Sequence, residues 1–460
     1  MNDNNRKPDG HGLKRALGFW SGVALVVGVV IGAGIFRTPA SIATVLQDPL
    51  LILGLWVFFG VVSMCGALTL AELATMMPRT GGTYVYLRAA YGDAAAFVFG
   101  WLYLLVAVPA GMAALSVFFG ELIFGLFGGL AAAGTWGIPA VAIFSLTALS
   151  LANILGVRSG SAITNFFTFV KVGALVIFIV AAFVSGQGDS ARWTVTPEGA
   201  ITDGGLAAAA KSVLFTYNGW IYVSLVAGEM IDPERRLTRI IVGGTGAIMA
   251  LYIAANLAYI YLIPLPAMPG TVVANEGMNL LFGPIGGTLM TLCILGSVFG
   301  TLNGVILTKA RVAFALARDK LSFAFLGRAH ATRATPYTSI LIQASMGILL
   351  VLVLHEPEHP LRLFDRLTAY FILVEWLALI FAIGAVFVLR RKMADAVRPY
   401  RTPFYPWVPL FFIVATVVGL SAVVWSSCSR GDYAPLVGLA VVIAGFPVHH
   451  LWKRSTKASA

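Results

Sequence analysis

Charged residues are scarce in this chain of 460 residues, where Asp, Glu, Lys and Arg together make up only 11% of the sequence. An ordinary soluble domain has about a quarter, and disordered chains and coiled coils also need more charge than this. Hydrophobic residues make up 59% of the chain, which is more apolar side chain than a soluble core of this length can bury. The composition therefore indicates a polytopic membrane protein, with room for roughly twelve spanning helices of about 20 residues each.

Cysteine is nearly absent as well. Cys65, Cys293 and Cys428 are too few and too widely spaced for a disulfide framework, and they lack the spacing of a zinc, iron–sulfur or catalytic-thiol site. We therefore expect no metal and no cofactor.

The sequence also lacks the patterns of other functional classes. Residues 26–34 superficially resemble a dinucleotide-binding turn, but Arg37 stands where the third glycine belongs and no suitable acidic residue follows about 20 residues later. No filter-like repeat or ring-forming charge pattern of a channel occurs. The net charge of +11 is attributed to basic cytoplasmic loops rather than to nucleic-acid binding. An enzyme and a channel are thus disfavoured, whereas a nutrient sensor with a transporter-like fold stays open.

Twelve apolar segments follow one another along the chain, separated by short polar stretches. None shows the alternation over about ten residues that is expected of an outer-membrane barrel strand, so the predicted fold class is all-α. The centres of the twelve predicted spans lie near Val30, Val61, Val106, Phe144, Leu175, Trp220, Tyr252, Val298, Leu349, Leu377, Thr416 and Val442.

The distribution of basic residues predicts the topology. With the N-terminus inside, the inside segments hold 24 of the 31 Lys and Arg residues, Lys309 and Arg311 among them, and the outside loops hold 4. The remaining three, Arg37, Lys171 and Lys211, fall within spans. Because cytoplasmic loops are enriched in Lys and Arg, we expect both termini in the cytoplasm.

Two predicted spans contain helix-weakening residues. Span one has Gly28, Gly32 and Gly34 within seven residues, and span six has Asn218-Gly219 at mid-membrane. A glycine costs a helix about 1 kcal/mol relative to alanine, although small residues also allow close helix packing. The two spans are five apart, as an inverted repeat of five plus five helices requires, and broken helices at matching positions are typical of transporter binding sites.

Such breaks suit a zwitterionic ligand. The half-helix that begins after Gly34 points its positive end at the gap and can bind a carboxylate, while carbonyls at the ends of the other half-helices can accept from an ammonium. An α-amino acid meets both needs without a charged side chain. The predicted substrate-binding residues in the two breaks are Ile31, Gly32, Ala33, Gly34, Phe215, Tyr217, Asn218, Gly219 and Trp220.

Several motifs occur in a specific order from about residue 17 to residue 406. They are Gly32-Ala33-Gly34-Ile35-Phe36, Ala71-Glu72-Leu73, Pro78-Arg79-Thr80-Gly81-Gly82-Thr83-Tyr84, Tyr217-Asn218-Gly219-Trp220, Phe299-Gly300-Thr301-Leu302-Asn303-Gly304 and Arg398-Pro399-Tyr400-Arg401-Thr402-Pro403. In these motifs the chain resembles the amino acid–polyamine–organocation superfamily, and within it the bacterial branch of the L-type amino acid transporter family.

The resemblance implies a LeuT-like fold that works by alternating access. A ten-helix core would occupy residues 16–400, two additional helices residues 401–452, and cytoplasmic tails residues 1–15 and 453–460. It also implies sodium independence, with Lys171 standing where related folds bind sodium. From its depth in the span, we expect the Lys171 ammonium to bridge carbonyls of the span-one break to the hydroxyls of Ser297 and Thr301. No disulfide-linked heavy chain is expected, because the chain has no cysteine between spans three and four.

The resemblance places Glu375 and Trp376 beside the pocket, as further substrate-binding candidates. Three interpretations of Glu375 stay open: a contact to a substrate side chain, a proton site, or a partner of Lys211. We expect small or medium neutral L-amino acids moved by exchange across a bacterial cytoplasmic membrane, with a proton-coupled symporter or a carrier of cationic amino acids or polyamines as alternatives. Glu72 has two interpretations, a proton carrier or a structural anchor that pairs with a basic loop residue, and the anchor is favoured.

Overall fold

The computed structural model describes residues 15, 17–127, 129–155, 157–195, 201–202, 204–330, 335–358, 362–429, 431 and 433–458. The predicted N-terminal tail, except for Arg15, and residues 459–460 lie outside the described residues. The described part of the chain is helical and contains isolated bridges but no strand, which confirms the all-α prediction.

The first half of the chain builds the first five predicted spans. Its helical elements are α1 (Phe19–Val30), α2 (Gly34–Ala43), α3 (Pro49–Met76), α4 (Thr83–Tyr91), α5 (Asp93–Leu102), η2 (Tyr103–Ala107), α6 (Val108–Phe127), η3 (Leu130–Ala133), α7 (Gly137–Leu155), α8 (Val157–Val184) and η4 (Ser190–Trp193).

The second half repeats the pattern and adds two helices. Its elements are α9 (Gly205–Thr216), α10 (Tyr222–Leu225), η5 (Ala227–Glu229), α11 (Pro233–Leu262), η6 (Leu265–Ala267), α12 (Val273–Arg318), η7 (Ala324–Gly327), α13 (Tyr337–Leu354), α14 (Arg362–Lys392), α15 (Trp407–Ser429) and α16 (Ala434–Ala458). Residues 453–458, which were expected in a tail, extend this last helix.

Eleven segments of the described chain are long and apolar enough to span a membrane. The remaining predicted span is the sixth, centred near Trp220, which falls short of that length because it is divided into α9 and α10. Span one is divided into α1 and α2. The two breaks that were predicted from glycine and asparagine are therefore present at the predicted places.

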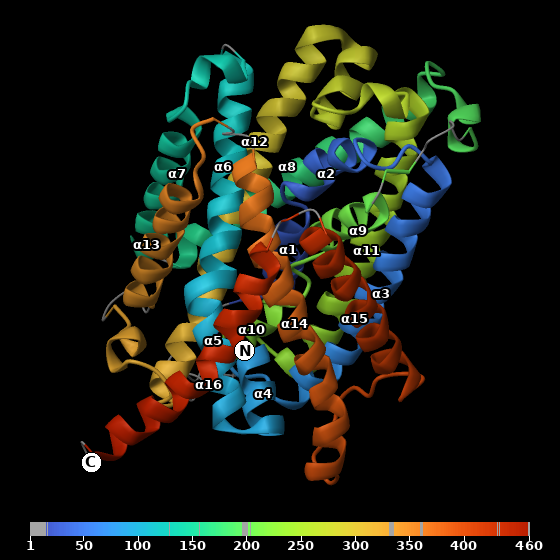
Figure 1. The fold of residues 1–460 in the computed structure, drawn as a ribbon. Coiled ribbons are helices and arrows are strands. Elements are labelled where there is room, and N and C mark those ends of the chain that lie inside the picture. The colour runs from blue at the N-terminus through green and yellow to red at the C-terminus, as the bar shows by residue number, and fades with distance from the viewer. Residues whose placement is uncertain are drawn as a thin grey trace.

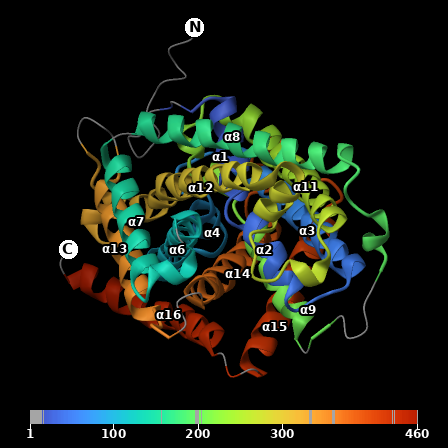
Figure 2. The same cartoon turned by 90° about the horizontal axis from the view of Figure 1, so that it is seen from above.

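The two halves of the first broken span lie in the interior of the bundle. Seen from above, α1 and α2 are surrounded by α3, α8, α11 and α12, while α7, α13, α15 and α16 lie at the periphery (Figure 2). Helix α4 and the C-terminal turns of α16 lie at one end of the bundle, the lower end in Figure 1. We call this the terminal end. The opposite end, where a large cavity lined by residues of α2, α6, α9 and α12 opens, is called the vestibule end.

Glycine allows the two broken spans to touch. A Cβ atom on Gly34 would lie 2.6 Å from Thr216 Oγ1 and 2.8 Å from Thr216 Cα, so only glycine lets the start of α2 reach the end of α9. In span six, Gly219 has a φ of +121°, a region that L-residues with side chains rarely adopt. Glycine at these two positions therefore permits the close contact between the two spans and the turn within span six.

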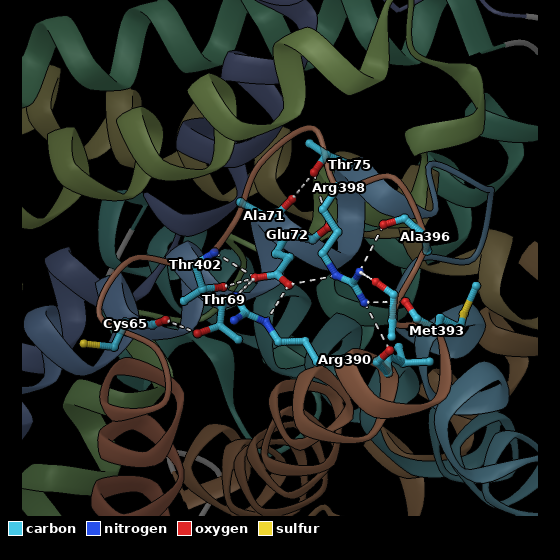
Figure 3. Close-up of polar contacts among 12 residues, drawn as sticks. Cys65, Thr69, Ala71, Glu72, Thr75, Arg390, Met393, Ala396, Arg398 and Thr402 are labelled. Atoms are coloured by element: carbon cyan, nitrogen blue, oxygen red, sulfur yellow. Dashed lines mark hydrogen bonds and ion pairs between the residues drawn. The ribbon is translucent and has the colours of Figure 1, made fainter.

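Glu72 anchors the terminal end (Figure 3). Its carboxylate accepts from Arg390 Nε and Nη2 at 3.0 and 2.7 Å, and from the backbone N and the hydroxyl of Thr402 at 2.7 Å each. Arg398 Nε lies 3.3 Å from the same carboxylate. The structure thus confirms the predicted anchor, which joins α3 to α14 and to the segment that leads into α15.

We expect Glu72→Gln to lower the free energy of unfolding by about 3 kcal/mol, because the nearly buried Arg398 loses its counter-charge. Thermal unfolding in detergent measures this. The matched control is Glu356→Gln, which breaks an exposed pair with Arg366, 42–43% exposed, and should cost at most about 1 kcal/mol. Equal losses in the two variants would contradict the anchoring role.

Two cations that were assigned to the inside segments lie elsewhere. Lys309 and Arg311 are 0% and 1% exposed and belong to the continuous helix α12. The prediction was wrong because the helix continues to Arg318, well past the apolar stretch. Without them the inside count falls from 24 to 22, still far above the 4 outside.

Candidate functional site

A cavity of about 40 Å³ lies where the two helix breaks meet. Residues of both breaks line it together with residues of α6, α12 and α14. Among the predicted binding residues, five line this cavity: Gly32, Ala33, Gly34, Phe215 and Asn218. The folded chain thus brings together two segments that are about 180 residues apart in the sequence.

The start of α2 offers unpaired donors at the cavity. Gly32 N donates to Val30 O at 2.8 Å, and the first bond of the new half-helix runs from Arg37 N to Ala33 O at 3.0 Å. The N–H groups of Ala33, Gly34, Ile35 and Phe36 have no backbone acceptor in the described part of the chain. A helix start with free N–H groups favours an anion such as a carboxylate.

The predicted acceptors for an ammonium are already engaged. The carbonyl of Ile31 accepts from Lys171 Nζ at 2.8 Å, and that of Phe215 accepts from Asn218 N at 3.3 Å. Val30 O accepts from Tyr252 Oη at 2.6 Å. Each carbonyl has two lone pairs, and Val30 O and Ile31 O already have two donors each, because Gly32 N and Ser297 Oγ donate to them as well. A ligand ammonium would therefore find a second position only at Phe215 O.

Lys171 occupies the space behind the span-one break. Its Nζ donates to the carbonyls of Gly28, Ile31 and Ser297 at 2.7, 2.8 and 3.0 Å, and to Thr301 Oγ1 at 2.9 Å. The side chain is 1% exposed. These are the elements that the sequence predicted for it, except that Ser297 accepts through its backbone. The lysine therefore ties α1, α8 and α12 together with four hydrogen bonds.

Glu375 pairs with Lys309, and not with Lys211 as one interpretation held. Lys309 Nζ lies 2.8 Å from both carboxylate oxygens, and Tyr103 Oη donates to Glu375 Oε1 at 2.8 Å. Both charged side chains are 0% exposed. Lys211 instead lines a different cavity, nearer the vestibule end.

Lys309 is the residue that sequence reasoning missed. It lines the cavity, and its ammonium lies 4.2 Å from the ring centroid of Tyr222 and 4.4 Å from that of Tyr103. The sequence contained a signal for it, because Thr301, Val305 and Lys309 follow one another at intervals of four. In the structure all three line the cavity. That spacing places them on one helix face.

Asn218 carries an unpaired polar atom. Its Oδ1 accepts from Tyr222 Oη at 2.8 Å, whereas its Nδ2 is buried and has no partner in the described chain. The residue is 7% exposed and lines the cavity. A buried amide donor without an acceptor costs free energy, so this atom points to a ligand with an oxygen acceptor.

The other predicted residues lie behind the cavity wall. Tyr217 Oη donates to Trp56 O at 3.0 Å, and Trp376 Nε1 donates to Leu214 O at 3.2 Å. Trp220 packs edge-on against Phe412, and Trp376 stacks on the same ring. These side chains support α9 and α10 and do not line the cavity, nor do Ile31, Gly219 and Glu375.

The cavity is closed toward the vestibule end. Arg37 Nε donates to Glu121 at 3.1 Å, and Nη1 donates to Asp365 at 3.1 Å. The guanidinium carbon lies 3.9 Å from the ring centroid of Phe364. Beyond this cluster opens a vestibule of about 800 Å³, lined by Lys211 and other residues of α2, α6, α9 and α12.

The path toward the terminal end is closed as well. Arg311 Nε donates to Glu229 at 2.9 Å, and both side chains are buried. Leu17 exchanges backbone hydrogen bonds with Glu229 O and Ile231 N, both 2.9 Å long. Tyr84 Oη donates to Asp319 at 2.8 Å. The small cavity is therefore enclosed between two sets of polar contacts on opposite sides.

We expect Gly34→Val to abolish ligand binding at the cavity, because its side chain would push α2 away from Thr216 and displace the free N–H groups. The control is Gly54→Ala, whose Cβ meets nothing within 4 Å. Isothermal titration with a ligand that binds the wild type measures the effect. Unchanged affinity in Gly34→Val would show that the start of α2 does not bind the ligand.

Comparison with known proteins now decides the family. The family model described as "Amino acid permease" matches residues 17–445. The chain belongs to the amino acid permease family. The permease is 32% identical to the serine/threonine exchanger SteT of Bacillus subtilis over 451 residues, which cover 96% of this chain and 98% of that protein.

Animal transporters are similar over the same length. The human b(0,+)-type amino acid transporter 1 is 27% identical over a stretch that covers 97% of this chain and 90% of that protein. The human cystine/glutamate transporter is 26% identical over 97% of this chain and 88% of that protein. The permease is therefore a multi-pass amino acid transporter of the L-type group within the amino acid–polyamine–organocation superfamily, and not an enzyme. This confirms the family that the motifs predicted.

Proposed function

We propose that the permease exchanges small neutral L-amino acids, serine and threonine among them, without sodium and by alternating access. The observation that carries this proposal is the cavity itself. It is small, it joins unpaired N–H groups with the unpaired Nδ2 of Asn218, and its one charged lining residue, Lys309, is neutralised by Glu375.

A small neutral substrate suits these walls. The N–H groups at Ala33 and Gly34 would bind the α-carboxylate, and Asn218 Nδ2 would donate to a hydroxyl oxygen of the side chain. A lysine or arginine side chain would meet the Lys309 ammonium, while Glu375 already has two donors. The printed name of the bacterial relative, a serine/threonine exchanger, agrees with this proposal.

Sodium independence rests on Lys171. Its ammonium already supplies a positive charge to the carbonyls of Gly28 and Ile31, which are the oxygens of the helix break that a sodium ion would need. A cation placed beside it would suffer repulsion in a medium of low dielectric. Transport should therefore proceed equally in sodium and in choline.

Exchange rather than proton symport is supported by the state of Glu375. The carboxylate is fully buried, ion-paired and hydrogen-bonded to Tyr103, so it has no open position for a transported proton. The bacterial relative is also named an exchanger.

Orientation and partners complete the proposal. We propose that the terminal end and both termini face the cytoplasm of a bacterial cell, since cytoplasmic loops are enriched in basic residues. The vestibule then faces outward. We propose that the permease works without a disulfide-linked heavy chain, since residues 121–140 contain no cysteine.

Purified permease in liposomes tests the proposal. Uptake of labelled serine should need unlabelled serine or threonine inside the vesicles, be equal in sodium and choline, and ignore an imposed pH gradient. Serine ethyl ester, N-acetylserine and ethanolamine should fail to compete. Uptake into empty vesicles driven by protons would indicate a symporter, and strong competition by arginine would move the substrate class to cationic amino acids.

A further inference from the structure

A second cavity lies far from the substrate site, at the terminal end. It measures about 90 Å³ and is bordered by α5, η2, the end of α12 with the segment that follows it, and α16. Its walls are almost wholly apolar, with Leu104, Leu105 and Leu316 as aliphatic members. Because Leu104, Leu105 and Phe323 are partly or largely exposed, this crevice opens at the surface of the bundle.

Aromatic rings frame the mouth of the crevice. The ring centroids of Phe323 and Trp452 are 4.7 Å apart with the planes at 81°, and Phe97 lies 6.4 Å from Trp452. Phe97 also stacks on Trp101 at 6.4 Å. Tryptophan rings are enriched at the membrane interface, where one side is apolar and the other polar. Rings of this kind suit a site where an acyl chain meets its headgroup.

Trp101 supplies an independent sign of a ligand. It lines the crevice, and its Nε1 is buried with no hydrogen-bond partner in the described part of the chain. An indole N–H that is buried normally finds an acceptor. The ester and phosphate oxygens of a phospholipid are acceptors that lie beside an acyl chain, so one ligand would satisfy both the apolar walls and this donor.

Two lysines adjoin the crevice along the chain. Lys320 and Lys453 are exposed, and each is the sequence neighbour of a lining residue, Leu321 and Trp452 respectively. The acidic side chains of this region are Asp319, which Arg88 binds at 2.6 Å and Tyr84 at 2.8 Å, and Asp93, which the same arginine binds at 2.8 Å. Basic pockets between spanning helices bind anionic lipid headgroups.

We propose that this crevice binds one anionic diacyl phospholipid from the surrounding leaflet. An acyl chain lies along the leucine walls, an oxygen of the glycerol or phosphate region accepts from Trp101 Nε1, and the phosphodiester lies near Lys320 and Lys453. The lipid would join α16, at the periphery of the bundle, to α5 and α12, which adjoin the transport core. This inference depends on the chain spanning a bilayer and not on the substrate that it carries.

Lipid titration tests the proposal on delipidated permease in detergent. Dioleoyl phosphatidylglycerol should raise the unfolding temperature more than dioleoyl phosphatidylcholine, and native mass spectrometry should retain one copy per chain. Lys320→Gln and Lys453→Gln should each weaken the apparent affinity for phosphatidylglycerol roughly fivefold, since a surface cation contributes about 1 kcal/mol to anionic lipid binding. The matched control Arg239→Gln, an exposed cation on α11 at the same end, should leave this affinity unchanged.

Two further arms locate the lipid. Phosphatidylglycerol with brominated acyl chains should quench tryptophan fluorescence less in Trp101→Phe than in the wild type, while glycerophosphoglycerol, which lacks acyl chains, should give no stabilisation. Equal stabilisation by the two lipids would overturn the proposal, as would an undiminished preference in the double variant of Lys320 and Lys453. A dimer mass without retained lipid would show instead that a second copy covers the crevice.

Discussion

Lys171→Met should reduce the initial rate of amino acid exchange by about 100-fold, because small displacements in a pre-organised site have effects of this size. Lys171 lies on α8, and its ammonium donates four hydrogen bonds, two to carbonyls of the first broken span and two to α12. This one group therefore connects the span-one break to both helices. Methionine has a similar length and no donor. The break would then lose the contact that couples it to its scaffold.

The variant should nevertheless fold. Ser297 Oγ still donates to Ile31 O at 3.2 Å and Thr301 Oγ1 to Gly28 O at 2.9 Å, so the freed carbonyls keep donors. Thermal unfolding in detergent should therefore change far less than exchange in liposomes. Thr301→Ser, which keeps the hydroxyl, is the control and should retain most activity. Normal exchange in Lys171→Met would contradict the role of this lysine.

The pair of Lys309 and Glu375 should show strongly unequal effects of its two single variants. Lys309→Met leaves the Glu375 carboxylate buried with Tyr103 as its remaining donor, and we expect the free energy of unfolding to fall by about 3–5 kcal/mol. Glu375→Gln keeps an oxygen acceptor for Lys309 and Tyr103, and Lys309 borders the cavity, where water can solvate it. The free energy of unfolding should therefore fall less in Glu375→Gln, by about 1–2 kcal/mol.

The double variant separates charge from packing. Lys309→Met combined with Glu375→Gln contains no charge in the pair, and the amide oxygen that replaces the carboxylate would still accept from Tyr103. We expect it to be more stable than Lys309→Met alone, with a coupling energy of at least about 2 kcal/mol between the sites. Additive losses would show that the two side chains act independently, and arginine uptake by the double variant would show that Lys309 excludes cationic substrates.

Much of this architecture is readable along the chain. Twelve apolar segments, glycines in span one and Asn218-Gly219 in span six predicted an all-helical bundle with two breaks, and the structure has both breaks. The anchor at Glu72 was also predictable, since a carboxylate near a span end needs a cation. These features depend on hydrophobicity and backbone propensity, which are local properties of the chain.

The residues that surround the cavity depended on tertiary packing. Trp220 belongs to the span-six break, and the resemblance placed Trp376 beside the pocket. Both side chains nevertheless pack against Phe412 behind the cavity wall. Lys309 looked like a loop cation and instead lies against Glu375, 66 residues later. Which side chain faces a cavity is set by helix rotation and by the partners on neighbouring helices, and a linear pattern does not contain those partners.

Amino acid order alone therefore determined the membrane class, the helical spans and the position of both breaks, because bilayer thickness and helix propensity act on each segment separately. Only the folded bundle decided that Lys309 neutralises Glu375 beside the cavity, and that Arg37 and Arg311 close the two ends. These are contacts between helices far apart in sequence. Each of these buried charges is stable only beside its specific partner, and the partners become neighbours only in the folded structure.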